Sequence, residues 1–324
     1  MNRRRVLLAA PAIVSVPWVA RADDRGWPAR PVTFVVPLSA GSPTDIMARA
    51  LAQELSAKLG QPIVIDNKTG GGGLIATTAV QKAKPDGYTY LFTISSHSIN
   101  PAVRKRSGYD PIRDFTPIGL IGAVPHILVL GKHVPASNLQ ELIALARSKP
   151  GGLSYGSAGV GISNHMEGEL FAGMIGATMV HVPYKGGSSE ARADLFAGRI
   201  DMLFDVLGNA APLIREGRLK PIGVAQARRS KLAPDLPTLS EVGLPGFDVM
   251  PWTGLLGPSG VDPSIVSKLG RTLVETVSDP RMTARLATTG IEAIAYTPTE
   301  FGDFLKRDFE QWVRVARDAR IELE

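Results

Sequence analysis

Hydrophobic and polar residues follow two alternating spacings along most of the chain. Short apolar runs such as residues 32–37 are typical of buried strands, and most are followed by a segment whose apolar residues recur at helical spacing. In residues 46–59, apolar positions 46, 47, 50, 51, 55 and 59 fall on one face of a helix. Because strands that alternate with helices usually pair in parallel, the pattern predicts an α/β fold with helices on both faces of its sheets.

The predicted elements fall into two groups. Strands are expected at residues 32–37, 63–67, 88–94, 127–131, 153–157, 179–184, 200–204 and 221–226, and helices at 46–59, 74–82, 139–147, 164–175, 189–197, 211–216 and 299–321. Two parallel-rich sheets joined near residues 125 and 226 would leave a cleft between them. We therefore expect two lobes, the first formed by residues 23–124 plus 227–324 and the second by residues 125–226.

The first 22 residues have the pattern of an export signal. Residues 1–5 carry three arginines, residues 6–19 are mostly apolar, and Ala20-Arg21-Ala22 matches a cleavage site. A buried helix is disfavoured by Pro11 and Pro17. The sequence therefore predicts a periplasmic protein cleaved after Ala22, and the paired arginines also admit twin-arginine export.

Charge and cysteine content narrow the function classes. The formal net charge of the 324-residue chain is +6, and four of its arginines lie within the predicted leader, which leaves about +2 for the rest. Such a small net positive charge does not indicate binding to nucleic acid or to a membrane surface. The absence of cysteine excludes a disulfide scaffold, thiol catalysis and cysteine-ligated metal.

Small residues gather where four predicted strands lead into helices, at residues 39–45, 69–73, 157–163 and 185–189. Ligands of open parallel sheets bind at such junctions, and the unpaired amides of a helix N-terminus attract anions. The alternative is architectural. Ser42-Pro43-Thr44-Asp45 resembles a capping box, and residues 70–73 are typical of a flexible turn. Both readings stay open for each junction, although several junctions together favour an anion site.

Catalytic patterns are weak. Residues 155–159 miss the G-x-S-x-G nucleophile elbow by one position, and the full phosphate-loop spacing is absent near Lys185. The five histidines lack H-E-x-x-H, although His165 and Glu169 share a helix face. The best-placed carboxylates, Asp45, Asp201 and Asp205, do not form an evident acid and base pair. We expect no enzyme activity, no cofactor and no metal. An exported hydrolase or lyase using His165 and Asp205 remains the alternative.

Several short motifs follow one another in a specific order. They are Pro37-x-x-Ala40-Gly41-x-Pro43-Thr44-Asp45-x-x-Ala48-Arg49, Lys84-Pro85-Asp86-Gly87-Tyr88-Thr89, Ile99-Asn100-Pro101, Tyr109-Asp110-Pro111, Asp114-Phe115-Thr116-Pro117, Tyr155-Gly156-Ser157-Ala158-Gly159-x-Gly161 with His165, His181-Val182-Pro183-Tyr184-Lys185-Gly186, Ala197-Gly198-x-Ile200-Asp201-x-x-Phe204-Asp205 and Leu236-Pro237-Thr238. Through them the chain resembles, from about Trp27 to its end, the substrate-binding proteins of tripartite tricarboxylate transporters, the Bug-type receptors.

The resemblance implies a two-lobed fold of the type II periplasmic binding proteins. It implies a small carboxylate ligand (an organic acid, an amino acid or an aromatic acid) held between the lobes, and delivery to membrane transporter subunits. We expect a monomer; a sensor kinase as the partner is the alternative to a transporter. Carried over by position, the implied ligand contacts are Leu38, Ala40, Gly41, Ser42, Thr44, Asp45, Ser157, Ala158, Gly159, Ser163, His165, Lys185, Gly186 and Asp205.

Two positions depart from the family pattern. Leu38 stands where the family commonly has an aromatic residue, and Ser42 stands where it has a second glycine. Both changes alter the expected pocket wall and leave the ligand open. Asp45 would oppose a second anion nearby, so we expect its carboxylate to bond helix amides, a water or a ligand amine. Trp252 is placed near the cleft.

Overall fold

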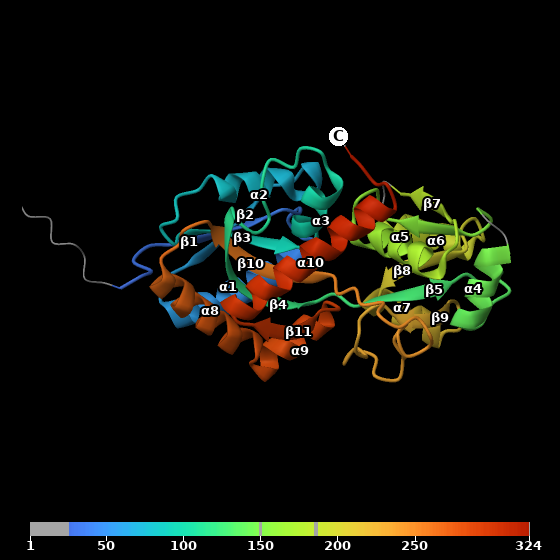
Figure 1. Cartoon of the computed structure of the whole chain (residues 1–324). Helices are drawn as coiled ribbons and strands as arrows, with labels where there is room; N and C mark the ends of the chain where they lie inside the picture. The colour runs from blue at the N-terminus through green and yellow to red at the C-terminus, as the bar shows by residue number, and fades with distance from the viewer. Residues whose placement is uncertain (1–25, 149–150, 185–186, 324) are drawn as a thin grey trace, which may run out of the picture.

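The computed structural model describes residues 26–148, 151–184 and 187–323, which form two lobes, each a sheet flanked by helices (Figure 1). The sheet of the first lobe has the strand order β11-β4-β10-β3-β1-β2. Its strands are β1 (Val32–Val36), β2 (Ile63–Asn67), β3 (Thr89–Ile94), β4 (Phe115–Ala123), β10 (Trp252–Pro258) and β11 (Glu292–Tyr296). Its helices are α1 (Pro43–Leu59), η1 (Gly71–Gly73), α2 (Leu74–Gln81), α3 (Ser96–Val103), α8 (Pro263–Val277), α9 (Pro280–Thr288) and α10 (Pro298–Asp318).

The second lobe has the strand order β7-β6-β8-β5-β9. Its strands are β5 (His126–Leu130), β6 (Ser154–Ser157), β7 (Val180–Pro183), β8 (Met202–Val206) and β9 (Lys220–Val224). Its helices are α4 (Leu139–Ser148), α5 (Ser163–Ile175), α6 (Ser188–Phe196) and α7 (Leu207–Arg215). The predicted two-lobed α/β fold is confirmed.

Both sheets are mixed. β1 pairs in parallel with β2 and β3, and β6 with β7 and β8, whereas β10 and β5 each pair antiparallel with both neighbours. The sequence prediction missed β4, β10 and β11. Pro117 and several glycines interrupt the apolar run of β4, Gly254 and Gly257 lie within β10, and β11 is half-buried along its whole length. Their place in the sheet follows from long-range pairing rather than from local pattern.

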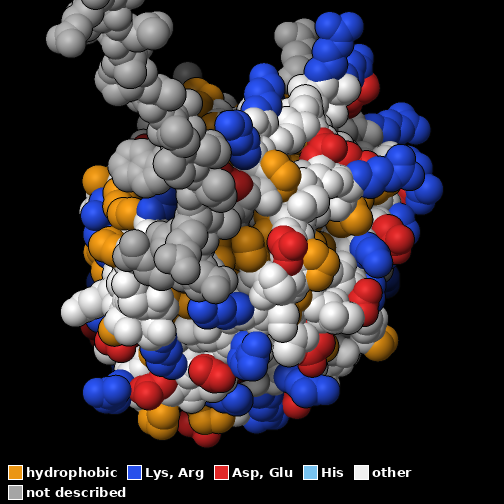
Figure 2. All heavy atoms as spheres, turned by 90° about the vertical axis from the view of Figure 1, so that its left-hand side faces the viewer, with side chains coloured by type: hydrophobic (Ala, Val, Ile, Leu, Met, Phe, Trp, Pro, Cys, Tyr) orange, Lys and Arg blue, Asp and Glu red, His pale blue; other side chains and the backbone are white. Residues whose placement is uncertain are grey.

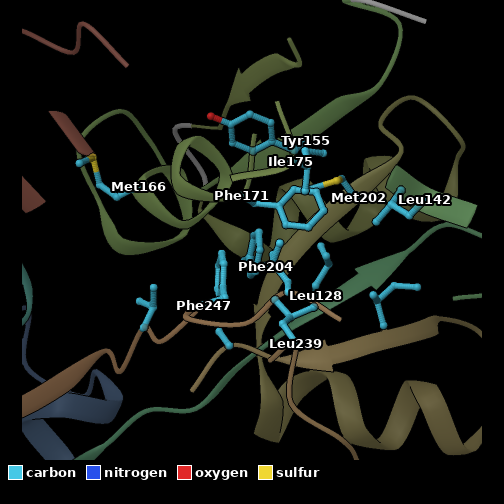
Figure 3. Packing of buried hydrophobic residues seen from close by; sticks show 14 of the residues in the cluster. Leu128, Leu142, Tyr155, Met166, Phe171, Ile175, Met202, Phe204, Leu239 and Phe247 are labelled. Atoms are coloured by element: carbon cyan, nitrogen blue, oxygen red, sulfur yellow. The ribbon is translucent and has the colours of Figure 1, made fainter. Parts of the chain in front are cut away.

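The core of the second lobe centres on aromatic side chains from distant segments (Figure 3). The rings of Phe204 on β8 and Phe247 stack at 5.7 Å with an interplanar angle of 6°. Leu239 and Val249 belong to the same buried cluster. Because residues 227–249 pack on this core, we propose that the second lobe extends to about Val249 rather than to residue 226.

Two chain segments connect the lobes side by side. Val124 follows β4 and its amide donates to the carbonyl of Pro251, 2.7 Å away, just before β10. Helix α10 adds a third link, because Trp312, Val315 and Ala316 pack into the core cluster of the second lobe. Figure 1 shows α10 running from the first lobe toward α5 of the second.

The visible face of the first lobe carries both signs of charge. Figure 2 shows Lys and Arg side chains interspersed with Asp and Glu side chains on this face. In the ranges that the structure describes, no helix is long and apolar enough to cross a bilayer.

Candidate functional site

The loop that follows β1 is held in shape by Asp45. Its side chain is only 2% exposed, and Oδ2 accepts hydrogen bonds from the Gly41 amide and from Nε of Arg49, both at 2.9 Å. Oδ1 accepts from Nδ2 of Asn67, also at 2.9 Å, and this amide donates in addition to the carbonyl of Leu38. Asp45 therefore ties the loop to α1 and to the end of β2.

The charge of Asp45 is fixed by these partners. Burial by itself would raise the pKa of this carboxyl group, but the hydrogen bonds from Arg49, Gly41 and Asn67 outweigh burial and place the pKa below its ordinary value. The carboxylate is therefore ionised near neutral pH and its charge is compensated inside the loop.

Ser42 confirms the capping interpretation at this junction. Its hydroxyl accepts a hydrogen bond from the Asp45 amide at 3.2 Å, and Pro43 occupies the first helical position. Other backbone amides of the loop take no part in this cap, however. Among the described residues, the amides of Ser39 and Ala40 have no hydrogen-bond partner, and both residues are exposed. Gly41 has φ of 80°, which only glycine adopts without strain.

The matching loop of the second lobe follows β6 and is braced by buried polar side chains. Oγ of Ser157, a fully buried residue, bonds the amide of Gly159 at 3.1 Å and its carbonyl at 2.9 Å. The Ala158 amide donates to Oδ1 of Asn164 at 3.2 Å, and the Gly161 amide donates to Nδ1 of His165 at 3.1 Å. These contacts fix the path of the loop into α5.

Some helices have a side-chain cap and others do not. Side-chain caps are present on α1, α8, α9 and α10, where they are Ser42, Asp262, Asp279 and Thr297. Helices that start where β6, β7 and β8 end have no side-chain cap, and their N-cap residues are Ile162, Gly187 and Val206. An uncapped N-terminus keeps amide donors and a partial positive charge available to an anion.

Two histidines lie beneath the second-lobe loop, with their rings close together and tilted against each other. The ring centroids of His165 and His181 are 4.0 Å apart, and Nε2 of His181 lies 2.6 Å from Oγ of Ser157. Burial and the neighbouring His181 lower the pKa of His165 to about 3, and burial lowers the pKa of His181 to about 4. Both rings are neutral near pH 7. His165 accepts from Gly161 at Nδ1, so its proton is on Nε2.

The carboxylate of Asp205 is fully buried and paired. Arg192 on α6 donates to it from Nε at 2.6 Å and from a terminal nitrogen at 2.9 Å. Close by, Nδ1 of His126 lies 2.8 Å from Oε2 of Glu167. Asp205 thus belongs to a buried layer of charged side chains in the second lobe.

A chain of contacts connects the loops of the two lobes. A Cβ atom at Gly161 would lie 2.9 Å from Cδ1 of Leu323 and 3.2 Å from Cγ2 of Val103 on α3. In turn Nδ2 of Asn100, also on α3, donates to the carbonyl of Gly72 at 2.9 Å. The neighbouring Gly73 faces Pro37, since a Cβ there would be 3.4 Å from it. These contacts link the loop after β6 through α3 to the segment before α2.

The predicted site residues differ in their exposure. Ala40, Gly41, Ala158, Gly159 and Ser163 are exposed or half-exposed in the two loops, as are Leu38, Ser42 and Thr44, whereas Asp45, Ser157, His165 and Asp205 are buried beneath them. Lys185 and Gly186 lie outside the described residues. Trp252, predicted near the cleft, has its indole buried in the first lobe, where it donates to Asp308 at 2.8 Å.

Sequence reasoning also missed the residues that brace the loops. Asn67, Asn164 and Arg192 each bond a predicted site residue or its loop, from elements that no local motif marks. Only the fold brings them there.

Comparison with known proteins decides the family. The model of the tripartite tricarboxylate transporter family receptor matches residues 47–320. The chain belongs to this receptor family. Protein BugT of Bordetella pertussis is 32% identical over 329 residues, covering 100% of both chains. R. palustris Rpa4515 with adipate is 36% identical at a TM-score of 0.77, covering 91% of this chain and 99% of that one. MatC (Rpa3494) from Rhodopseudomonas palustris with bound malate is 33% identical at a TM-score of 0.73, covering 89% and 99%.

The receptor family gives the two-lobed fold its role. Its members are periplasmic solute-binding proteins, and the resemblance inferred from the sequence motifs is confirmed.

Proposed function

We propose that this receptor captures a small carboxylate between the loops after β1 and β6 and delivers it to the membrane subunits of a tripartite transporter. The observation that carries the proposal is the uncapped N-terminus of α5 beside a loop whose small residues Ala158 and Gly159 are half-exposed. Two structural neighbours hold adipate and malate, which are both dicarboxylates. Charge-assisted hydrogen bonds of about 1.5–3 kcal/mol each suffice for a micromolar Kd after ordering costs.

The predicted contacts divide into two roles. Direct contact is assigned to Leu38, Ala40, Gly41, Ser42, Thr44, Ala158, Gly159 and Ser163, with Lys185 and Gly186 as expected from the family pattern. Asp45, Ser157, His165 and Asp205 act by positioning the loops, because their polar atoms are bonded within the protein. A neutral His165 supplies no cation to the ligand.

The same geometry argues for binding without chemical conversion. Ser157 and His181 are in hydrogen-bond contact, as in a nucleophile and base pair, but Ser157 is fully buried and bonded to Gly159. Substrate has no access to that hydroxyl. We further propose that the protein acts as a monomer and that residues 1–22 are removed on export. N-terminal sequencing of the secreted protein should then begin at Asp23.

A thermal-shift screen tests the proposed function. The purified protein is mixed with mono-, di- and tricarboxylates, including adipate and malate, and with amino acids and aromatic acids. A ligand at 100 times its Kd should stabilise the fold by about 2.7 kcal/mol. Gly217→Val, at φ of 66° with open space around it, should leave the shift almost intact, whereas Gly159→Val, which places a side chain at φ of 136°, should abolish it. Absence of a shift with every carboxylate, or turnover of one of them, contradicts the proposal.

A further inference from the structure

A cavity of about 1110 Å³ lies between the lobes, apart from the loops described above. Its walls are the second half of α5 with the turn after it, the connecting residues 246–250, and the face of α10 that includes Phe304 and Arg314. Helix α5 begins at the cleft with Ser163, and the cavity wall begins at Glu169. None of the described residues proposed to contact the carboxylate lines this cavity, which we call the α5–α10 groove.

The charged lining of the groove is predominantly acidic. Its carboxylates are Glu169, Asp248, Asp308, Glu310 and Asp318, against the two guanidinium groups of Arg307 and Arg314. The formal balance is therefore negative in a chain whose net charge is +6. Asp308 is bonded to two indoles and Asp318 is paired with Arg317, whereas Glu310 is exposed at the groove.

The apolar lining of the groove suits a flexible, partly cationic occupant. Met174, Met179 and Met250 supply adaptable thioether surface, and Tyr296 and Phe304 supply aromatic rings. Aromatic faces attract ammonium and guanidinium groups. The volume is at the upper limit for a small-molecule pocket, which is roughly 300–1,000 Å³, so a segment of polypeptide fits better than a single metabolite.

We propose that the α5–α10 groove binds a basic segment of the transporter's membrane subunit, in which Lys or Arg residues are flanked by apolar ones. The inference rests on the proposed function, because it requires a membrane partner. Charge complementarity selects the partner: its cations face Glu169, Asp248 and Glu310, and its apolar residues face the methionines.

Glu169 connects this groove to the ligand loop. Its Oε1 accepts a hydrogen bond from the Tyr155 hydroxyl and lies 3.8 Å from Nε2 of His165. Nδ1 of the same His165 accepts from the Gly161 amide in the loop after β6. A cation that binds near Glu169 is therefore one side chain away from a group that shapes the carboxylate site, so groove and ligand loop can respond to each other.

Site-directed cross-linking tests the groove, because the chain has no cysteine of its own. Thr178→Cys places a thiol at the groove, and Ser267→Cys places one at an exposed position of α8, which contributes no residue to the groove lining. Each variant is labelled with a benzophenone maleimide and irradiated with membrane vesicles that contain the epitope-tagged membrane subunit. We expect at least tenfold more cross-linked subunit from Thr178→Cys than from Ser267→Cys.

Two further substitutions in the Thr178→Cys background define the chemistry. Glu310→Lys reverses an exposed charge of the groove, and Gly173→Trp fills it, since a Cβ at Gly173 meets no atom within 4 Å. Each should reduce cross-linking at least tenfold. Glu275→Lys on α8 is the matched control and should have no effect. Unchanged thermal shifts with the carboxylate found in the screen verify that the fold and the cleft are intact.

The outcomes separate the groove from the receptor function. Equal cross-linking from both thiols, cross-linking of Thr178→Cys to a second copy of the chain, or full cross-linking by Glu310→Lys and Gly173→Trp overturns the groove proposal. If a lysine-reactive reagent that samples the whole surface still joins the wild-type protein to the subunit, delivery to a transporter stands without the groove. If that reagent also fails, delivery to a transporter is overturned, and the groove proposal with it.

Discussion

Nδ1 of His126 and Oε2 of Glu167 lie 2.8 Å apart in the interior of the second lobe, immediately after the chain crosses from the first. His126 opens β5, and its carbonyl accepts from the Ala225 amide of the returning chain. Both side chains are almost fully buried, and the second oxygen of Glu167 has no hydrogen-bond partner within the described part of the chain. The pair therefore joins the connection between the lobes to α5, whose N-terminus borders the ligand loop.

The His126–Glu167 pair predicts a pH-dependent stability. Burial would lower the pKa of His126, but the charge and hydrogen bond of Glu167 and the charge of Asp205 outweigh it and raise the pKa. A raised histidine pKa contributes stability that is complete below about pH 6.5 and is lost as the pH rises through the folded-state pKa. His126→Gln should therefore cost about 3–5 kcal/mol at pH 6, measured by urea unfolding, and less at pH 9.

The double variant His126→Gln with Glu167→Gln is the control for that prediction. It removes both members of the pair, so no uncompensated carboxylate stays buried, and it should be more stable than His126→Gln alone at pH 6. Equal stability of the single and double variants across this range would contradict a charged pair.

The buried carboxyl group of Asp308 predicts a second pH dependence of stability, which comes from an acidic side chain rather than from a histidine. Burial raises the pKa of this carboxyl to about 6, although the indoles of Trp252 and Trp312 donate to it at 2.8 and 3.0 Å. The folded state holds the proton more tightly than the unfolded chain, so its contribution is complete below about pH 4 and falls as the pH rises through 6. The free energy of unfolding of Asp308→Asn, measured relative to that of the wild type, should therefore rise by about 3 kcal/mol from pH 4 to pH 7.

Urea unfolding at four pH values between 4 and 7 measures this difference. Asp303 lies on the same helix with an exposed side chain, and Asp303→Asn should follow the wild-type pH profile. A difference between Asp308→Asn and wild type that stays constant with pH rules out a raised pKa.

Asp45 is expected to determine the shape of the first-lobe loop. Asp45→Ala leaves the Gly41 amide and the Asn67 amide without their acceptor, so the loop should loosen and the fold should lose about 1–3 kcal/mol. Carboxylate affinity should fall at least tenfold in calorimetric titrations with the ligand from the screen. Asp66→Ala on the adjacent strand β2 removes only a surface ion pair with Lys68 and should change stability by less than about 1 kcal/mol. If Asp45→Ala bound the carboxylate with wild-type affinity, Asp45 would not be a positioning residue for this loop.

Gly161 is expected to tolerate no side chain where the two lobes meet. It has φ of 76°, and a Cβ atom would press on Leu323 and Val103. Gly217 has φ of 66° but open space around its Cα, so Gly217→Ala has the same backbone strain without the clash. Gly161→Ala should lower the melting temperature more than Gly217→Ala.

A second substitution isolates the contact at Gly161. Combining Gly161→Ala with Leu323→Ala makes room at the contact and should recover part of the lost stability and carboxylate affinity. Strict additivity of the two substitutions would show that the side chains do not meet.

Local pattern predicted the elements that have a strong local cause. Helix α1 follows from a capping serine, a proline at its first position and one apolar face, and the strands β1 and β8 follow from short, mostly apolar runs. In the same way, glycine and serine at the ends of β1 and β6 indicated where a ligand would bind. These signals are local because caps, turns and amphipathic faces involve residues close together in sequence.

Long-range contacts decided the rest. β10 enters the sheet between β3 and β4 from more than a hundred residues away, despite its glycines, and Phe247 stacks on Phe204. Asp45 and His165, which sequence reasoning assigned to the ligand, are bonded to the loops they support.

By itself the sequence determined an α/β receptor with glycine-rich loops at the ends of its strands. The tertiary structure decided which of the predicted side chains are exposed in the loops, which are buried and bonded beneath them, and that a separate acidic groove lies between α5 and α10. The physical reason is that backbone preference acts within a few residues, whereas burial and ion pairing depend on partners that only the folded chain brings together.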